Sequence, residues 1–292
     1  MKKILILGSN GFVGRNLVGY LHSVGGYEIL CPSRRELDLI KEEEVGRYLE
    51  KHRIDVVVHS AIFTPQGEAD EQLVVENDLR IFYNLEKYSD MYEKMIYLGS
   101  GAEYGKQGDI SSVCEEQIGE RIPSDPYGFA KYVIGKHIEQ SSNIYNFRIW
   151  GLFGKYEDWW STFISGCCCK AIKNYPLSIR QDLYFDYVWI DDFCRVLEWS
   201  IDHDLKYHTY NVGSGKRVRL SEIAEDIRRI SGKHIDIFIC EAGLGREYTA
   251  NRERLIKEYG REYCTPMADA IQNVYQWYME NEKIINMRDL IY

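Results

Sequence analysis

Short apolar runs alternate with amphipathic helical stretches along the first half of the chain. Four apolar residues follow one another at 4–7, and comparable runs recur further along. Runs of this length suit strands that are buried on both faces of a parallel sheet. The pattern predicts strands at residues 4–7, 28–31, 54–61, 94–100 and 145–150, and helices at residues 42–51 and 74–88. Strands that alternate with helices in this way predict an α/β fold.

The pattern changes after residue 154. Residues 155–187 are rich in aromatic side chains and less regular, whereas residues 188–200 return to a short strand and a helix. We expect further elements at residues 209–212, 220–231 and 266–283. The sequence therefore predicts one domain over residues 1–154, to which residues 188–212 return, and a smaller mixed α/β cap formed by residues 155–187 and 213–292.

Three glycines follow the first apolar run. Gly8, Gly11 and Gly14 stand between that run and a stretch with helical spacing, so we expect a strand, a tight turn and a helix. Such a turn directs free helix N–H groups toward an anion. Gly8 allows the turn, Gly11 admits a pyrophosphate, and Gly14 lets the helix pack on the strand. The spacing indicates dinucleotide binding; the alternative is a glycine-rich turn that binds nothing.

The end of the second predicted strand bears on the choice of cofactor. A carboxylate at this place grips the ribose 2'-hydroxyl of NAD, but the chain has Cys31 here, followed by Arg34 and Arg35. A guanidinium suits the 2'-phosphate of NADP in both geometry and charge. The pattern favours NADP with Arg34 on the phosphate, NAD being the alternative; a solvated arginine pair is the other interpretation. Asp38 is placed to approach the adenine.

One serine, one tyrosine and one lysine form the candidate catalytic set. Ser100 ends the strand predicted at 94–100, at the sheet edge where ligands bind. Ser124 or Asp125 caps the next helix, and Tyr127 and Lys131 lie four apart on one of its faces. A nearby ammonium lowers the pKa of a tyrosine from its ordinary value of about 10. We therefore expect Lys131 to tune Tyr127 while Ser100 binds the same substrate oxygen.

Composition excludes several classes of function. The 292 residues carry a net charge of -9, so we expect no binding to nucleic acid or to an anionic membrane. The first apolar run is too short for a signal peptide, which predicts a cytoplasmic protein. The eight cysteines include three in a row at 167–169 but no CxxC pair. Adjacent side chains on a helix point in different directions, so we expect free thiols and no metal site.

Taken together, these motifs resemble the extended short-chain dehydrogenase/reductase family, in its branch that acts on nucleotide sugars. The similarity covers nearly the whole chain and includes the glycine turn, the segments at 77–85, 100–105, 186–192 and 211–215, and the pair Tyr127 and Lys131. It implies a Rossmann domain with a doubly wound parallel sheet, a cap that binds a nucleotide sugar, and a homodimer built on four helices. The implied cofactor contacts are Gly8, Asn10, Gly11, Phe12, Val13, Gly14, Arg34, Asp38, Leu39, Ser60, Ala61, Asn77, Tyr127 and Lys131.

Within this branch, residues 34–39 and 275–281 are similar to the NADPH-dependent GDP-fucose synthases. The chain departs from these enzymes at the epimerisation residues, since Ala102 stands near their Cys and Tyr156 falls in their His region. The dehydratases of the branch carry Asp-Glu where this chain has Gly101 and Ala102. Phe185 replaces the family's usual Arg before Asp186. The candidate substrate contacts are Ala102, Glu103, Arg180, Arg217 and Arg246; for each arginine, a solvated surface position is the alternative.

Three hypotheses for the function follow. The first is an NADP-dependent reductase of a nucleotide-linked 4-keto (6-deoxy) sugar, because the Ser, Tyr and Lys set is complete while the added residues for epimerisation and dehydration are absent. The second is a nucleotide-sugar 4-epimerase that uses tightly held NAD. The third is a dinucleotide-binding sensor without catalysis, a class that commonly loses the Tyr or the Lys.

Overall fold

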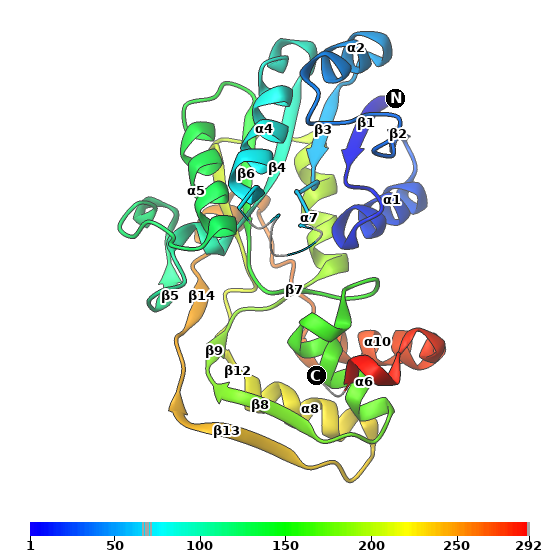
Figure 1. Cartoon of the computed structure of the whole chain (residues 1–292), viewed down its shortest axis with the longest axis vertical. Coiled ribbons are helices and arrows are strands. Elements are labelled where there is room, and N and C mark those ends of the chain that lie inside the picture. Colours follow the sequence, from blue (N-terminus) through cyan, green and yellow to red (C-terminus); the bar gives the residue numbers. More distant parts are fainter. Residues whose placement is uncertain (66, 68–69, 71, 291–292) are drawn as a thin grey trace.

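A computed structural model describes residues 1–65, 67, 70 and 72–290 of the chain, with the backbone alone at residue 287. Figure 1 shows a larger lobe that contains the N-terminus above a smaller one. The first part of the chain contains β1 (Lys2–Leu7), α1 (Phe12–Val24), β2 (Tyr27–Leu30), α2 (Glu42–His52), β3 (Val56–His59), α4 (Val74–Glu86), η1 (Ser89–Met91), β4 (Lys94–Ser100), η2 (Gly101–Tyr104), β5 (Ile110–Val113), η3 (Glu115–Gln117), α5 (Pro126–Ile138), β6 (Ile144–Ile149) and β7 (Leu152–Phe153).

The second part contains η4 (Trp159–Ser161), α6 (Phe163–Ile172), β8 (Leu177–Asp182), β9 (Tyr184–Phe185), β10 (Val188–Trp189), α7 (Ile190–Asp202), β11 (Thr209–Val212), β12 (Val218–Arg219), α8 (Leu220–Ser231), β13 (Ile237–Leu244), β14 (Tyr248–Ala250), α9 (Glu253–Tyr259), α10 (Met267–Glu280), η5 (Glu282–Ile284) and η6 (Met287–Leu290).

The larger lobe is built on a six-stranded parallel sheet in the order β11-β6-β4-β3-β1-β2. The chain passes from β1 outward to β2 and then returns to β3 on the other side of β1. This reversal is a topological switch point, where ligands of doubly wound sheets bind. The predicted fold class, a Rossmann doubly wound parallel sheet with a smaller C-terminal lobe, is confirmed.

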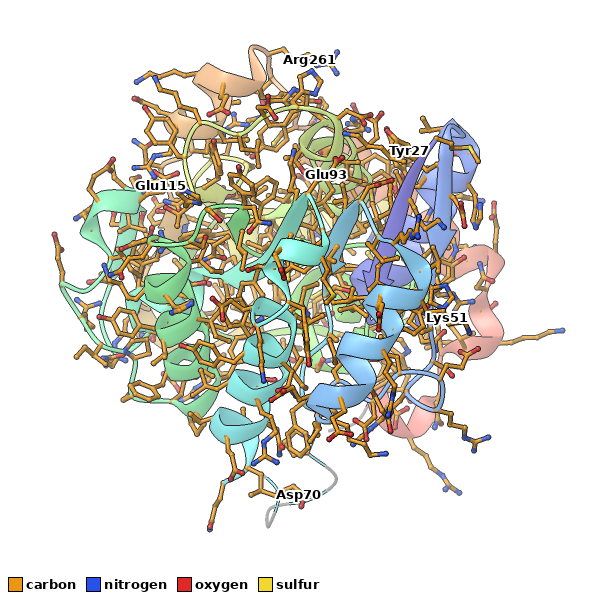
Figure 2. The ribbon with its side chains drawn as sticks, turned by 90° about the horizontal axis from the view of Figure 1, so that it is seen from above. Tyr27, Lys51, Asp70, Glu93, Glu115 and Arg261 are labelled. Atoms are coloured by element: carbon orange, nitrogen blue, oxygen red, sulfur yellow. The ribbon has the colours of Figure 1, made fainter. Side chains whose placement is uncertain are left out.

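Alternate residues of each strand serve two separate cores. Ile4 and Ile6 of β1 pack toward α1 and α7, whereas Leu5 and Leu7 pack toward α2, α4 and α5. All four are at most 2% exposed, which explains why the strand is an unbroken apolar run. Figure 2 shows α2, α4 and α5 side by side on one side of the strands.

The strand that returns late in the chain completes this sheet. β11 pairs with β6 from Thr209↔Asn146 to Val212↔Ile149, and α7 packs against α1. Helix α7 and strand β11 therefore lie with the larger lobe. The predicted domain boundaries stay a prediction, and the segment 213–292 includes residues 291–292, which lie outside the described residues.

The smaller lobe contains the elements predicted at 220–231 and 266–283, which are helices α8 and α10, and others that the hydrophobic pattern did not predict. Helices α6, α8 and α10 pack into one core together with β8. β8 pairs with β13 in a two-stranded ribbon, and a four-stranded sheet has the order β12-β9-β14-β5. β5 belongs to the segment assigned to the first domain, yet it pairs with β14, so the two lobes share a sheet.

Among the described residues, no helix has both the length and the apolar character needed to cross a membrane. All eight cysteines are free thiols, and Cys167, Cys168 and Cys169 are buried on α6.

Candidate active site

The glycine turn connects β1 to α1 in a conformation that demands glycine. Gly8 has φ +79°, and a Cβ there would lie 2.8 Å from the Ala61 backbone nitrogen. A Cβ on Gly14 would lie only 2.3 Å from the Gly8 carbonyl oxygen. Gly11 caps α1 without a side-chain hydrogen bond, and the first turn has no acidic residue. The helix N-terminus therefore keeps its positive potential for an anion.

A cavity of about 310 Å³ opens beside this turn. The predicted cofactor contacts that line it are Gly8, Asn10, Gly11, Arg34, Asp38, Leu39 and Ala61. Phe12, Val13, Gly14, Ser60, Asn77, Tyr127 and Lys131 are not in its lining. Ser60 instead donates from Oγ to the Leu7 carbonyl at 2.6 Å, and Asn77 is buried on α4.

Arg34 stands at the mouth of this cavity. Its side chain is 75% exposed, and its Nε lies 4.0 Å from Asp38 Oδ1. Asp38 also has Lys41 Nζ at 3.9 Å, so two cations offset its charge. Arg35 does not line the cavity, and Arg15 stacks on the ring of Tyr156, with Cζ 3.9 Å from the ring centroid.

These features fit a dinucleotide. The backbone at Gly8 and Gly11 approaches the cavity without a side chain, the N-terminus of α1 carries no acidic residue that would oppose an anion, and the Arg34 guanidinium lines the cavity. Gly8, Asn10 and Gly11 would hold the pyrophosphate, while Asp38 and Leu39 would lie near the adenosine.

Ser100, Tyr127 and Lys131 gather where β4 ends beside α5. Asp125 caps α5 by accepting the Gly128 N–H at 2.7 Å, so of the two predicted caps the structure uses Asp125. Lys131 is 3% exposed, donates to the Leu98 carbonyl at 2.7 Å, and lies 5.8 Å from the Tyr127 ring centroid. The assignment of catalytic roles to these three residues stays a prediction.

The electrostatics of this group differ from our expectation. Burial raises the pKa of Tyr127 to about 12, although the neighbouring Ser100 side chain opposes the rise. Burial also lowers the pKa of Lys131 to about 8, against the carboxylates of Asp78 and Glu103. We expected Lys131 to lower the pKa of Tyr127; here burial and the carboxylates of Glu103, Asp78 and Asp125 raise it.

The predicted substrate contacts are dispersed. Ala102 and Glu103 are 0% exposed, so the structure does not support a substrate contact for either. Arg180 pairs with Glu241 at 2.9 Å on the surface. Arg217 binds Glu247 through two hydrogen bonds of 2.7 and 2.6 Å, whereas Arg246 has a long 3.5 Å contact to a carbonyl.

Two residues near Ser100 were not among the predicted site residues. Tyr248 on β14 has its pKa raised by burial and lowered in part by the neighbouring Ser100 side chain, and its hydroxyl lies 2.4 Å from where a Cβ on Gly101 would stand. No motif in the sequence around Tyr248 indicates that it belongs to the site. Arg148 on β6 is 0% exposed and binds Glu103; a charged residue inside an apolar strand was the signal that could have found it.

Comparisons with known proteins agree with this architecture. Residues 4–213 match the NAD dependent epimerase/dehydratase family. The chain is 23% identical over 308 residues to the GDP-L-colitose synthase of Yersinia pseudotuberculosis, covering 96% of this chain and 99% of that protein.

Solved structures show the same fold. A GDP-L-fucose synthetase from Naegleria fowleri superposes with a TM-score of 0.84 at 16% identity, over 97% of this chain and 95% of that one. A GDP-mannoheptose C4 reductase from Campylobacter jejuni with NADP bound gives 0.82 at 18% identity, over 95% and 98% of the two chains. The chain therefore belongs to the NAD dependent epimerase/dehydratase family and is an NAD(P)-dependent enzyme of the extended short-chain dehydrogenase/reductase type.

Proposed function

We propose that the protein is an NADP-dependent reductase of a nucleotide-linked 4-keto sugar. The observation that carries this proposal is the group Ser100, Tyr127 and Lys131 at the end of β4 and on α5. The chain has Ala102 and Tyr156 where the epimerising synthases are expected to carry their Cys and His, so the residues for epimerisation are absent. Names of relatives support the substrate class, since a GDP-L-colitose synthase and a GDP-mannoheptose C4 reductase are among them.

In the proposed reaction each residue has one role. Ser100 binds the sugar carbonyl oxygen, and Tyr127 donates a proton to that oxygen as it becomes a hydroxyl. The high pKa of Tyr127 keeps this proton in place at neutral pH. Lys131, which lies beside Tyr127 on α5, would bind the ribose next to the nicotinamide. Hydride chemistry is supplied by the nicotinamide when the dinucleotide is bound.

The runner-up is a nucleotide-sugar 4-epimerase that retains NAD. Its support is structural likeness: the UDP-glucose 4-epimerase of Thermotoga maritima superposes with a TM-score of 0.81 at 19% identity, over 96% of this chain and 99% of that one. Both functions use the same three residues. They differ in net redox change, so consumption of NADPH separates them.

The first test combines a substrate screen with one substitution. Nucleotide-linked 4-keto sugars are offered with NADPH, and the loss of nicotinamide absorbance is followed. Tyr127→Phe should lower turnover by ~10²–10⁴-fold, because the proton donor is lost, while the affinity for NADPH changes little. Tyr132→Phe on the same helix is the matched control and should keep wild-type turnover.

Two outcomes would contradict the proposal. Wild-type turnover in Tyr127→Phe removes Tyr127 from the mechanism. Inversion of a UDP-sugar with protein-bound NAD and no loss of NADPH replaces the reductase by the epimerase.

A further inference from the structure

A fully buried carboxylate lies directly behind Ser100. Glu103 belongs to η2, the short helix that follows β4, and is 0% exposed. Its Oε1 accepts the Ser100 backbone N–H at 3.0 Å, and Ser100 Oγ accepts the Ala102 N–H at 3.1 Å. These bonds form a capping box, in which Glu103 holds the backbone of Ser100 while the backbone of Ala102 holds its hydroxyl oxygen.

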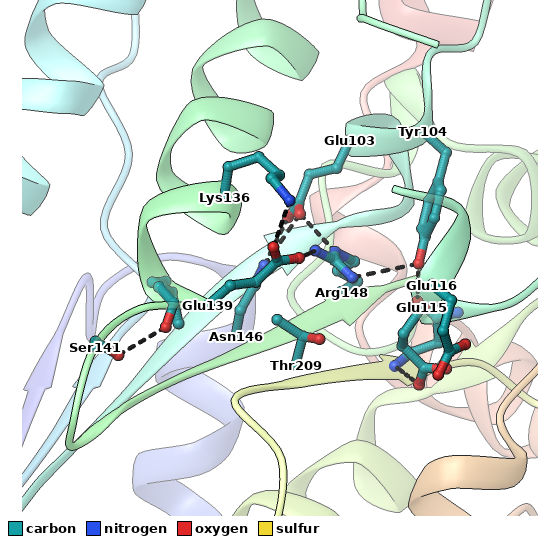
Figure 3. A network of polar contacts seen from close by, with 12 residues as sticks. Glu103, Tyr104, Glu115, Glu116, Lys136, Glu139, Ser141, Asn146, Arg148 and Thr209 are labelled. Atoms are coloured by element: carbon teal, nitrogen blue, oxygen red, sulfur yellow. Dashed lines mark hydrogen bonds and ion pairs between the residues drawn. The ribbon is translucent and has the colours of Figure 1, made fainter. Parts of the chain in front are cut away.

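The negative charge of Glu103 has a built counter-charge. Arg148, also 0% exposed, donates from Nε to Glu103 Oε2 at 2.6 Å. Asn146 donates from Nδ2 to both carboxylate oxygens, at 3.2 and 3.0 Å. Arg148 Nη2 lies 3.7 Å from Glu139. Figure 3 shows this group, with Glu103 and Arg148 meeting between α5 and β6.

Two further elements leave room for this carboxylate. A Cβ on Gly99 of β4 would lie 2.3 Å from Glu103 Oε1, and a Cβ on Gly135 of α5 would lie 2.4 Å from Oε2. Both strand and helix therefore carry a glycine where any side chain would displace the charge. A buried ion pair is a poor source of stability, since desolvation offsets much of its attraction. Its place behind Ser100 suggests a role in the site.

Glu103 also faces the other two residues of the site. It and Asp78 of α4 are the carboxylates that favour the charged form of Lys131, against burial. The remaining titratable groups around Lys131 and Tyr127 come from other elements: His59 of β3, Tyr97 of β4, Asp125 at the start of α5, and Tyr248 of β14. Among these and Glu103, only Glu103 is also bonded to the backbone of Ser100.

We propose that Glu103 is a positioning residue for the site: held by Arg148, its carboxylate fixes Ser100 at the end of β4 and places a negative charge against α5 at Gly135, one helical turn after Lys131. The effect on turnover rests on the proposed function, whereas the effect on Lys131 is a property of the free protein.

The test measures Lys131 in the full chain without cofactor. The protein is labelled with ε-13C lysine, and the Lys131 resonance is identified by its loss in Lys131→Arg. Glu103→Gln keeps the size and an acceptor for Ser100 but removes the charge. Its Lys131 titration midpoint should fall by about 1 pH unit, in the range that a neighbouring charge produces.

Two companion variants guard against a merely structural effect. Glu103→Gln combined with Arg148→Gln avoids an unpaired buried cation, and its midpoint should lie between those of Glu103→Gln and the wild type. Glu115→Gln is the matched control, because Glu115 is also buried, also accepts a backbone N–H at 2.8 Å and also has an arginine 3.8 Å away. It should leave the Lys131 midpoint unchanged.

A kinetic cycle tests the link to Ser100. Glu103→Gln should lower kcat about tenfold or more in the wild type but change it less than twofold in a Ser100→Ala background, because coupled residues are not additive. The proposal is overturned by an unchanged Lys131 midpoint in Glu103→Gln or the double variant, by an equal fall in Glu115→Gln, or by additive losses of kcat. If the protein does not catalyse the proposed reaction, the Lys131 titration still tests the role of Glu103, because it needs neither substrate nor turnover.

Discussion

At the scale of single residues, the rim of the cavity decides the cofactor. Cys31, directly after β2, offers no carboxylate to the ribose, and the acidic residue in the described lining of the cavity, Asp38, already faces Arg34 and Lys41. A lining without a free carboxylate removes the repulsion that would exclude a 2'-phosphate. NADP over NAD is therefore part of our proposal.

Arg34→Ala tests this preference. A charge-assisted hydrogen bond to the phosphate contributes roughly 1.5–3 kcal/mol, which corresponds to about ten- to a hundredfold in affinity. Titration of the apoprotein should show NADPH bound at least tenfold more tightly than NADH, and the substitution should remove most of that margin. Arg35→Ala is the control, since Arg35 does not line the cavity. An equal loss in both variants, or a preference for NADH, would contradict the assignment and favour the epimerase.

At the scale of elements, the hydrophobic pattern predicted where buried strands lie, but it did not predict which strands pair with one another. The predicted strands at 4–7 and 94–100 coincide closely with β1 and β4 because each is buried on both faces. β13 was not predicted, since most of its residues are exposed and β8 is its one partner strand within the described part of the chain. A strand of this kind is defined by its partner across 60 residues of chain, and a local pattern does not encode that.

The first helix allows the glycine turn to be tested against a control inside the same element. Gly14→Ala places a Cβ 2.3 Å from the Gly8 carbonyl oxygen, so α1 has to shift away from β1. We expect at least a tenfold loss of dinucleotide affinity, with a free energy of unfolding lower by about 1–3 kcal/mol.

Gly19→Ala, also in α1, meets nothing within 4 Å. It should raise the free energy of unfolding by about 0.5–1 kcal/mol, because alanine is the better helix former, and leave the affinity unchanged. Calorimetric titration and urea unfolding measure both effects. Equal behaviour of the two variants would show that the turn tolerates a β-carbon.

At the scale of the whole molecule, the sequence predicted the fold and brought the three site residues to one sheet edge, but it did not predict what surrounds them. Glu103 was expected to meet the substrate; it is instead buried and paired with Arg148, which lies 45 residues away in sequence. Tyr248 reaches Ser100 only because β14 joins the sheet that both lobes share. Contacts of this range depend on the assembled fold, and no spacing of residues along the chain reports them.

Glu157 connects the two lobes in a way that global unfolding can report. It follows β7 and is 8% exposed, and it accepts hydrogen bonds from Ser165 of α6 and from the Gly154 N–H. Burial raises its pKa from 4.5 to about 7, although these hydrogen bonds lower it. Between these two values the folded protein holds a proton that the unfolded chain has released.

The folded state therefore loses stability as the pH rises from about 4.5 to 7, and above pH 7 the full cost is present. A difference of this size corresponds to a cost on the order of 3 kcal/mol. Glu157→Gln keeps an acceptor for Ser165 and removes the charge. Urea unfolding of the variant and the wild type is measured at pH 5 and at pH 8. The gain in free energy of unfolding of the variant over the wild type should be larger at pH 8 than at pH 5, by a few kcal/mol. Asp158→Asn, at the exposed neighbouring position, should show no such difference. If Glu157→Gln shifts stability equally at the two pH values, the carboxyl does not titrate in this range, and the junction between β7 and α6 holds it in its charged form.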